Sequence, residues 1–322
     1  MISVVKPGLS TTVQDLGRVG YYDVGIPPSG ALDLFSLTAA NLLVGNAEGA
    51  AGLELAYLGP VLEFGADAVV AVCGGELTPK VDGDERPLWE AFEVPAGAVL
   101  SFAHLRGGAR AYVAVAGGID VPELLGSRST YALGALGGLE GRPLAAGDSL
   151  PVGSAGRASR AAVPEALRPT FSTELEIRVV MGLYDHLLTD DGRRTFAETT
   201  WTLTPTADRV GFRYKGSKLE MLNREQPFGA GSDPSNIVDA PYPIGSIQVP
   251  GGVEPIVLHR DAVSGGGYAM IATVISADMD AVAQSAPGAK TRFVAVDMDE
   301  ALAARAERNR RLQALREALT AA

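Results

Sequence analysis

The chain has 322 residues and a formal net charge of −11, from 38 acidic and 27 basic side chains. A nucleic-acid backbone or an anionic membrane surface needs a concentrated basic face, so this balance argues against both kinds of partner. The one cysteine, Cys73, follows the apolar run 68–72 and is expected to be a buried, unreactive thiol, which leaves no disulfide framework. No apolar run approaches the roughly 20 residues of a membrane helix. Since no secretory leader pattern follows Met1 either, we expect a cytoplasmic protein.

Helices are expected to be few. Residues 31–44 carry apolar side chains at helical spacing, with Ser29 as the expected cap and Gly45 as the expected end. From residue 299 to about 319, leucines form a narrow stripe among arginines and glutamates. This second pattern predicts a C-terminal amphipathic helix that packs on its parent domain, with packing on a partner as the alternative.

Most other elements are expected to be short strands, because β-branched or alternating apolar runs end at Gly, Pro or Asp. The 39 glycines and 20 prolines between them favour antiparallel barrels or sandwiches over a parallel sheet with crossover helices. The fold class is therefore predicted to be mainly β. The clearest strand segments are 109–116, 174–180, 255–258, 270–276 and 291–296.

The length favours two domains. Residues 154–172 are rich in Ser, Ala, Arg and Pro and show little strand pattern, so we interpret them as a linker. The predicted domains are then residues 1–153 and 173–298, followed by the C-terminal helix 299–322.

The first candidate site contains acids, arginines and hydroxyls. Asp15 and Arg18 lie among glycines and could form a positioned ion pair that grips a carboxylate or phosphate, or one that only pins a turn. Arg128 and Ser129 lie in a second polar segment, residues 127–131, which is followed by glycine-rich residues 137–142. Backbone N–H groups and guanidinium groups of such a loop suit an anion.

The second candidate site follows Gln248. His259 and Asp261 are two residues apart, so on an extended strand the carboxylate could orient the imidazole; a structural hydrogen-bonding role is the alternative. Residues 265–267 are three glycines before Tyr268, which would allow either close ligand approach or a tight hairpin. The three histidines are too scattered for a metal signature, so no metal site is expected. The sequence also contains no phosphate-binding Gly-x-x-x-x-Gly-Lys-Ser/Thr motif.

Short motifs that are weak alone occur together along the chain. They include Val13-Gln14-Asp15-Leu16-Gly17-Arg18, Gly25-Ile26-Pro27-Pro28-Ser29-Gly30, Ser127-Arg128-Ser129-Thr130-Tyr131, Asp208-Arg209-Val210-Gly211, Gly245-Ser246-Ile247-Gln248-Val249-Pro250 and Gly266-Gly267-Tyr268. In combination they resemble the KipA family, also called allophanate hydrolase subunit 2, the 5-oxoprolinase C subunit or the biotin-dependent carboxyltransferase family. The resemblance implies two cyclophilin-like β-barrel domains and a KipI-like partner subunit.

The resemblance implies several activities. The leading hypothesis is a subunit of an amide-cleaving complex of the ATP-dependent 5-oxoprolinase type, acting on a small lactam or ureido acid, with ATP used at the level of the complex. A carboxyltransferase subunit that accepts a carboxyl group from biotin on a partner protein is the second hypothesis, and a regulatory protein that binds a kinase is the third. The segment Glu254-Pro255-Ile256, the run 261–269 and Gly182-Leu183-Tyr184 depart from the family pattern in the second domain.

We assign hypothetical roles on this basis. Asp15, His259 and Asp261 are the candidate catalytic groups. A substrate carboxylate needs an arginine and its carbonyl needs hydrogen-bond donors. The candidate substrate-binding residues are Arg18, Arg128, Ser129, Arg209, Gln248 and Tyr268.

Overall fold

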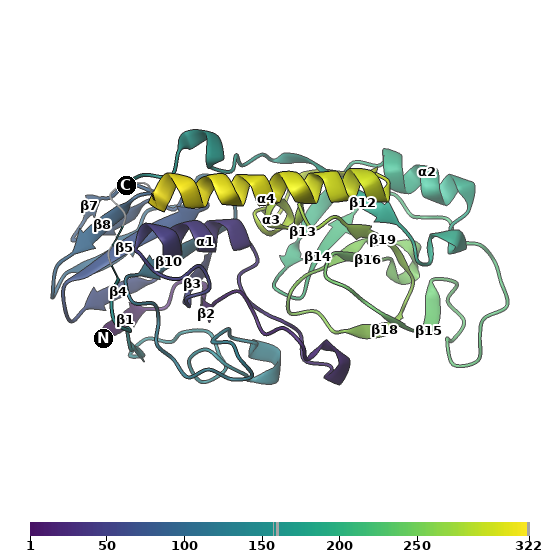
Figure 1. The fold of residues 1–322 in the computed structure, drawn as a ribbon. Coiled ribbons are helices and arrows are strands. Elements are labelled where there is room, and N and C mark those ends of the chain that lie inside the picture. The colour runs from purple at the N-terminus through teal and green to yellow at the C-terminus, as the bar shows by residue number, and fades with distance from the viewer. Residues whose placement is uncertain (157, 159–160, 321–322) are drawn as a thin grey trace. The chain divides into compact units, whose positions relative to one another are not determined.

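The computed structural model describes residues 1–156, 158 and 161–320. Among these residues twenty strands and four α-helices are found, so the predicted mainly β fold is confirmed (Figure 1). The chain divides into two units. The first consists of Met1–Val19, Ser29–Phe171 and the residues from Asn309 onward, and the second consists of Gly20–Pro28 and Ser172–Arg308.

Two antiparallel sheets enclose the core of the first unit. Six strands follow the order β11-β1-β4-β9-β6-β7 and five follow the order β2-β3-β10-β5-β8. Val4 and Leu62 of one sheet and Leu53 and Val113 of the other belong to one buried cluster. The strands are β1 (Ile2–Lys6), β2 (Ser10–Gln14), β3 (Gly52–Ala56), β4 (Val61–Phe64), β5 (Ala68–Gly74), β6 (Pro79–Val81), β7 (Asp84–Glu85), β8 (Ala91–Val94), β9 (Val99–Phe102), β10 (Arg110–Val115) and β11 (Ser149–Leu150).

The first helix, α1 (Leu34–Leu43), is shorter than predicted and begins at a different cap. Asp33 is the N-cap: its carboxylate accepts hydrogen bonds from the Ser36 backbone N–H at 3.0 Å and from the Ser36 hydroxyl at 2.6 Å. The prediction that Ser29 caps this helix is wrong. Ser29 and Gly30 have φ angles of 52° and 86°, which form a left-handed turn before the helix instead.

The helix α1 packs on the outer face of the five-stranded sheet. Phe35 and Leu43 of α1 share a buried cluster with Cys73 of β5, so the expected burial of the cysteine is confirmed. Leu315 and Leu319 from the last turns of the C-terminal helix join the same cluster, and Figure 1 shows this helix in yellow beside α1.

Seven strands of the second unit close into a barrel, in the order β12-β19-β16-β17-β14-β13-β20, and β15 and β18 form a separate two-stranded sheet. Buried aromatic rings pack together on two of these strands and a helix: Phe196, from the helix at residues 190–198, stacks on Phe293 at 5.1 Å, and Tyr214 meets Phe293 edge-on at 5.5 Å. The strands are β12 (Glu174–Met181), β13 (Trp201–Ala207), β14 (Gly211–Lys215), β15 (Asn236–Pro241), β16 (Ser246–Gln248), β17 (Ile256–Leu258), β18 (Gly265–Tyr268), β19 (Met270–Val274) and β20 (Lys290–Ala295).

The remaining helices are α2 (Asp190–Glu198), α3 (Met279–Ala283) and α4 (Met298–Thr320). Helix α2 was not predicted from the sequence. Its N-cap is Thr189, whose hydroxyl accepts a hydrogen bond from the Gly192 N–H at 3.0 Å. The C-terminal helix was predicted, and α4 corresponds to it; residues 321–322 of the predicted range lie outside the described residues.

Helix α4 contains residues of both units. Arg308 binds Asp280 within the second unit at 2.8 Å, and Arg316 binds Glu48 within the first unit at 2.6 Å. Leu302 at the start of the predicted leucine stripe is 51% exposed, whereas Leu315 is buried. Residues 154–156, 158 and 161–171 of the predicted linker are grouped with the first unit, and residues 157, 159 and 160 of that range lie outside the described residues.

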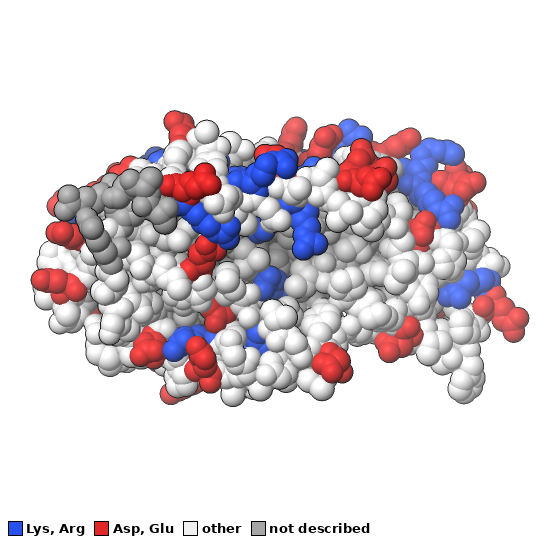
Figure 2. All heavy atoms as spheres, in the orientation of Figure 1, with Lys and Arg blue, Asp and Glu red and all other residues white. Residues whose placement is uncertain are grey.

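Among the helices of the described residues, none is long and apolar enough to cross a membrane. On the face shown in Figure 2, basic and acidic side chains are interspersed along the edge formed by α4, so the described residues of this face present no wide basic area.

Candidate functional site

Asp15 is the centre of the first candidate site. The residue follows β2 directly, and its carboxylate accepts hydrogen bonds from the Gly17 N–H at 2.7 Å, the Ser127 hydroxyl at 2.7 Å and the Arg128 N–H at 2.6 Å. The Ser129 hydroxyl donates to the same oxygen as Ser127. With four donors on two oxygens, the carboxylate ties the turn after β2 to the loop at 127–129, which is more than a hundred residues away in sequence.

Arg18 is bound to the same loop and is only 1% exposed. Its Nη2 donates to the Ser129 carbonyl oxygen at 2.8 Å, and its Nε donates to the Leu124 carbonyl oxygen at 3.3 Å. A buried guanidinium that binds backbone carbonyls holds two loops together. In this structure Arg18 therefore lies inside the first unit, among backbone oxygens.

Arg128 is already paired with acids. Its guanidinium binds Glu123 at 2.6 Å and Asp120 at 3.2 Å, and its Nε donates to the Val121 carbonyl oxygen at 2.7 Å. Farther along the glycine-rich segment, Arg142 binds Asp148 through two hydrogen bonds at 2.8 and 2.9 Å. These bonds lower the pKa of the Asp148 carboxyl. The charges of both arginines in this predicted anion loop are thus balanced by carboxylates of the same unit.

Gly137 and Gly138 allow this loop to close. Their φ angles are 66° and 55°, a left-handed conformation that L side chains rarely adopt. A Cβ at Gly137 would overlap the Ser129 carbonyl oxygen and lie 2.6 Å from Arg18 Nη2, and one at Gly138 would overlap the Thr130 hydroxyl. Glycine at these two positions is therefore a packing requirement of the Arg18 site.

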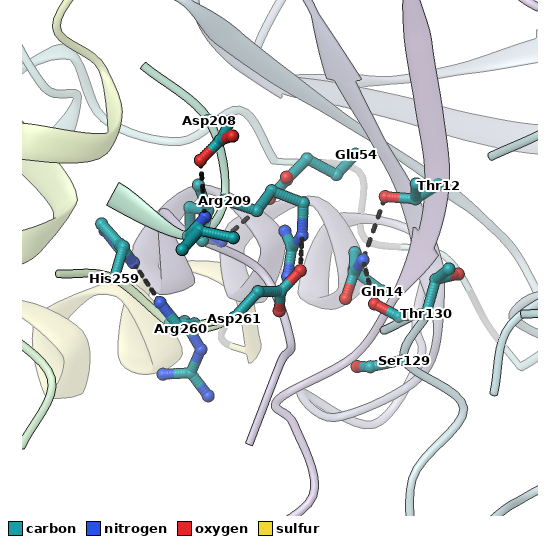
Figure 3. Close-up of polar contacts among 12 residues, drawn as sticks. Thr12, Gln14, Glu54, Ser129, Thr130, Asp208, Arg209, His259, Arg260 and Asp261 are labelled. Atoms are coloured by element: carbon teal, nitrogen blue, oxygen red, sulfur yellow. Dashed lines mark hydrogen bonds and ion pairs between the residues drawn. The ribbon is translucent and has the colours of Figure 1, made fainter. Parts of the chain in front are cut away.

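Gln14 and Glu54 complete the polar interior of the first unit, and the sequence analysis assigned neither a role. Gln14 Nε2 donates to Thr12 Oγ1 at 3.0 Å and to the Thr130 carbonyl oxygen at 3.1 Å (Figure 3), and its Oε1 accepts from the Gly30 N–H at 3.1 Å. Glu54 accepts hydrogen bonds from the Leu32 N–H and the Tyr112 hydroxyl, both at 2.8 Å. Both side chains thereby fix the turn that leads into α1. For Gln14, its place in the motif Val13-Gln14-Asp15-Leu16-Gly17-Arg18 was the available signal.

In the second unit, Arg209 and Asp261 form a two-point ion pair with distances of 2.8 and 3.0 Å (Figure 3). The Asp261 side chain is 6% exposed and that of Arg209 is 16% exposed. The Asp261 N–H also donates to the Arg209 carbonyl oxygen at 3.0 Å. The Asp261 carboxylate therefore binds and orients Arg209. As a catalytic base it would have to give up this ion pair.

His259 lies beyond the end of β17, which stops at Leu258. The expectation that His259 and Asp261 share one face of an extended strand is therefore wrong, because a turn begins there. The His259 ring is 1% exposed and lies 5.6 Å from the Phe212 ring, and its Nδ1 accepts a hydrogen bond from the Arg260 N–H at 3.0 Å. As the acceptor of this bond, Nδ1 presents a lone pair to the Arg260 N–H.

Tyr242, which was not predicted from the sequence, lies between Gln248 and Tyr268. The Tyr242 hydroxyl donates to the Tyr268 carbonyl oxygen and accepts from the Tyr268 N–H, both at 2.7 Å, and the nearby Gln248 side chain offsets part of the rise in the Tyr242 pKa. Tyr22 donates its hydroxyl to the Tyr242 carbonyl oxygen at 2.8 Å. Burial raises the pKa of Tyr242, which keeps this hydroxyl protonated as a donor. The prolines on both sides of Tyr242 were the signal in the sequence.

The described residues line two cavities away from the predicted site residues. One of about 610 Å³ in the first unit borders the end of β8 and the start of β5, and one of about 430 Å³ in the second unit borders Met221 and Gly251. Neither is lined by any candidate residue. Within the described part of the chain, no group of three or more His, Cys, Asp or Glu side chains could hold a metal ion.

Comparison with known proteins agrees with this architecture. The family model for the carboxyltransferase domain, subdomains A and B, matches residues 24–295. The C subunit of the Escherichia coli K12 5-oxoprolinase is 36% identical over 319 residues, which cover 98% of this chain and 97% of that protein.

Two further relatives are much longer than the part they share with this chain. The urea amidolyase of Saccharomyces cerevisiae is 35% identical over 303 residues, which are 91% of this chain and 16% of that protein. The crystal structure of Kluyveromyces lactis urea carboxylase superposes with a TM-score of 0.92 at 34% identity, over 98% of this chain and 29% of that one. The family resemblance predicted from the sequence is confirmed, and the chain belongs to the carboxyltransferase domain family, subdomains A and B.

Proposed function

We propose that this chain is one subunit of an ATP-dependent hydrolase complex of the 5-oxoprolinase type, which opens the amide C–N bond of a small lactam or ureido acid. The observation that carries the proposal is the match to the 5-oxoprolinase C subunit, because it extends over 98% of this chain and 97% of that protein. The urea amidolyase match covers only 16% of a much longer protein.

The geometry supports a subunit that needs a partner. Both carboxylates predicted to be catalytic, Asp15 and Asp261, already bind donors of their own unit. A general base must reach the proton it removes, so these groups serve first as positioning groups for their loops. The remaining reactive groups would come from a KipI-like subunit that binds the same substrate.

ATP is expected to bind the partner subunit, because the arginines of the predicted anion loop in this chain are already paired with carboxylates. A triphosphate needs cationic side chains that are not already neutralised. Arg128 is paired with Glu123 and Asp120, and Arg142 is paired with Asp148 and Glu140. These residues do not fit a nucleotide in this structure, so we derive no step on this chain through ATP.

A second function, transfer of a carboxyl group in a biotin-dependent urea carboxylase system, is favoured by the carboxyltransferase family model and by the TM-score of 0.92 to urea carboxylase. Biotin would then arrive on a partner protein, because the sequence contains no Met-Lys attachment motif.

The test is co-expression with the KipI-like subunit, followed by size-exclusion chromatography and an assay of ADP release with 5-oxoproline, urea or allophanate. We expect a stable complex that releases ADP when 5-oxoproline is added. Turnover of urea alone, and only with a biotin carboxylase present, would support the second function instead. A stable complex that is inactive with every substrate would contradict both functions.

A further inference from the structure

Four aliphatic side chains of the first unit are exposed on two neighbouring loops. Val19 is 83% exposed, Leu133 is 73% exposed, Leu124 is 40% exposed and Leu125 is 37% exposed. Single exposed apolar residues are common, but a group of them on adjacent loops marks an interaction surface. We call these four residues the loop surface.

The two loops are adjacent because buried polar groups clamp them. Arg18, next to Val19, donates to the Leu124 carbonyl oxygen at 3.3 Å. Asp15 binds the backbone N–H of Arg128 at 2.6 Å, three residues after Leu125. Leu133 lies in the following turn, which is closed by two hydrogen bonds between the backbones of Tyr131 and Leu136 at 2.8 and 3.1 Å.

These clamps make the loop surface rigid before any partner arrives. Leu125 has a φ angle of 55°, and Gly126 has one of 75°, so the backbone at its centre is fixed in a conformation that few residues adopt. An ordered surface loses little conformational entropy on association, which favours binding. The hydrogen bonds of Arg18 and Asp15 thus give these loops the order that strands of a sheet would otherwise provide.

The border of the loop surface has an excess of acids, because three carboxylates there face only the partly exposed Arg128 and Arg142. Glu123 and Asp120 are each 57% exposed, and Glu140 is 70% exposed. An apolar centre with a charged rim is the usual composition of a protein interface. A second copy of this chain would present the same acids, and its own net charge of −11 would oppose self-association.

We propose that the loop surface binds a second protein subunit, one that presents an apolar patch bordered by lysine or arginine side chains. The proposal rests on the proposed function, in which the chain works with such a subunit. Charge complementarity favours this partner over a second copy of the chain, because a basic rim would attract the carboxylates that exceed Arg128 and Arg142 in number, whereas a second copy carries the same excess of acids.

The test measures binding of the separately purified KipI-like subunit by titration calorimetry. The double variant Val19→Glu/Leu133→Glu should raise Kd by about tenfold or more, because it places two charges in the apolar centre. The double variant Leu9→Glu/Leu58→Glu is the matched control. It adds the same charge to the same unit at residues that are 65% and 50% exposed on the turn between β1 and β2 and just after β3, and it should change Kd by less than about twofold.

Folding and assembly are checked separately. The uncharged variant Leu124→Ala/Leu133→Ala should also weaken binding while leaving the thermal unfolding midpoint unchanged. Equal binding by wild type and all variants would overturn this proposal and leave the proposed function standing, whereas no binding by the wild type would overturn both. A wild-type dimer in sedimentation that the Val19→Glu/Leu133→Glu variant abolishes would assign the loop surface to a second copy instead.

Discussion

At the residue scale, the carboxylates that stand out in the sequence already accept several hydrogen bonds within the folded chain. Asp15 accepts four hydrogen bonds, and Asp261 accepts hydrogen bonds from both Nε and Nη2 of Arg209. A carboxylate with so many donors is a strong constraint on two chain segments, since removing it leaves several buried donors unsatisfied. Short acidic and arginine-containing motifs between glycines are therefore explained here by loop positioning.

The glycine at 137 gives a direct test of this explanation. Gly137→Ala should destabilise the first unit by about 3 kcal/mol or more, because the new methyl group overlaps the Ser129 carbonyl oxygen and crowds Arg18 in addition to the strain of a φ angle of 66°. The measurement is the free energy of unfolding in urea.

Gly126→Ala is the matched control for that variant. Gly126 has a φ angle of 75°, but a Cβ there would meet nothing within 4 Å. It should therefore cost only the backbone strain of about 1 kcal/mol. Equal destabilisation by the two variants would show that the close approach of Gly137 to Arg18 does not exist in solution.

At the scale of elements, strand β18 is held in place by the side chain of Tyr242. Three of its four residues are glycines, which contribute no side chain to packing and weaken a strand. A Cβ at Gly266 would lie 3.0 Å from the Tyr242 ring, so the strand runs closely across that ring. The Tyr242 hydroxyl then satisfies both backbone groups of Tyr268.

Tyr242→Phe should therefore loosen β18. Removing the hydroxyl takes away the partner of the Tyr268 N–H, at a cost of about 1–3 kcal/mol. We expect amide hydrogen exchange at Tyr268 to become on the order of tenfold faster or more. Tyr268→Phe is the control, because its own side chain is 44% exposed, and it should leave exchange nearly unchanged. Unaltered exchange in Tyr242→Phe would contradict the assigned role.

At the scale of the whole molecule, both units keep tyrosine hydroxyls in their interiors. Tyr112 of the first unit and Tyr214 of the second are fully buried. Burial raises the pKa of both, and the nearby carboxylates of Glu54 and Asp33 raise the pKa of Tyr112 further. Both phenols therefore keep their protons in the folded chain, and the Tyr112 hydroxyl donates to Glu54 at 2.8 Å.

These tyrosines predict a loss of stability in alkali. A folded-state pKa above that of the unfolded chain means that the unfolded state releases protons first as the pH rises. Stability is thus fully present below about pH 10, the ordinary tyrosine value, and falls above it by about 1.4 kcal/mol per pH unit for each such group. Urea unfolding between pH 8 and 11 measures this slope.

Tyr214→Phe separates this effect from general repulsion in a chain with a net charge of −11. Above about pH 10, the free energy of unfolding of the second unit should fall less steeply with pH in the variant. The difference should be roughly 1.4 kcal/mol per pH unit, the contribution of one titrating group. An identical slope in the variant would mean that Tyr214 is not protected from titration in the folded state.

The sequence by itself determined the class of the fold and its family. The strands predicted at 109–116, 174–180 and 291–296 correspond to β10, β12 and β20, and the C-terminal helix corresponds to α4. These predictions succeeded because alternation and helical spacing are local properties, readable within a few residues. The same local patterns failed for α2, which has a short run of mainly polar residues, and for the cap of α1, where Asp33 replaces Ser29.

Only the tertiary structure decided what the candidate residues do. Asp15 binds residues 127–129, Arg18 binds Leu124 and Ser129, and Tyr242 binds Tyr268. The first two pairings join residues more than a hundred positions apart, and no local period encodes them. The sequence thus supplied the chemical groups, while the folding of distant loops onto one another fixed which donors each group faces and therefore which groups remain for a partner.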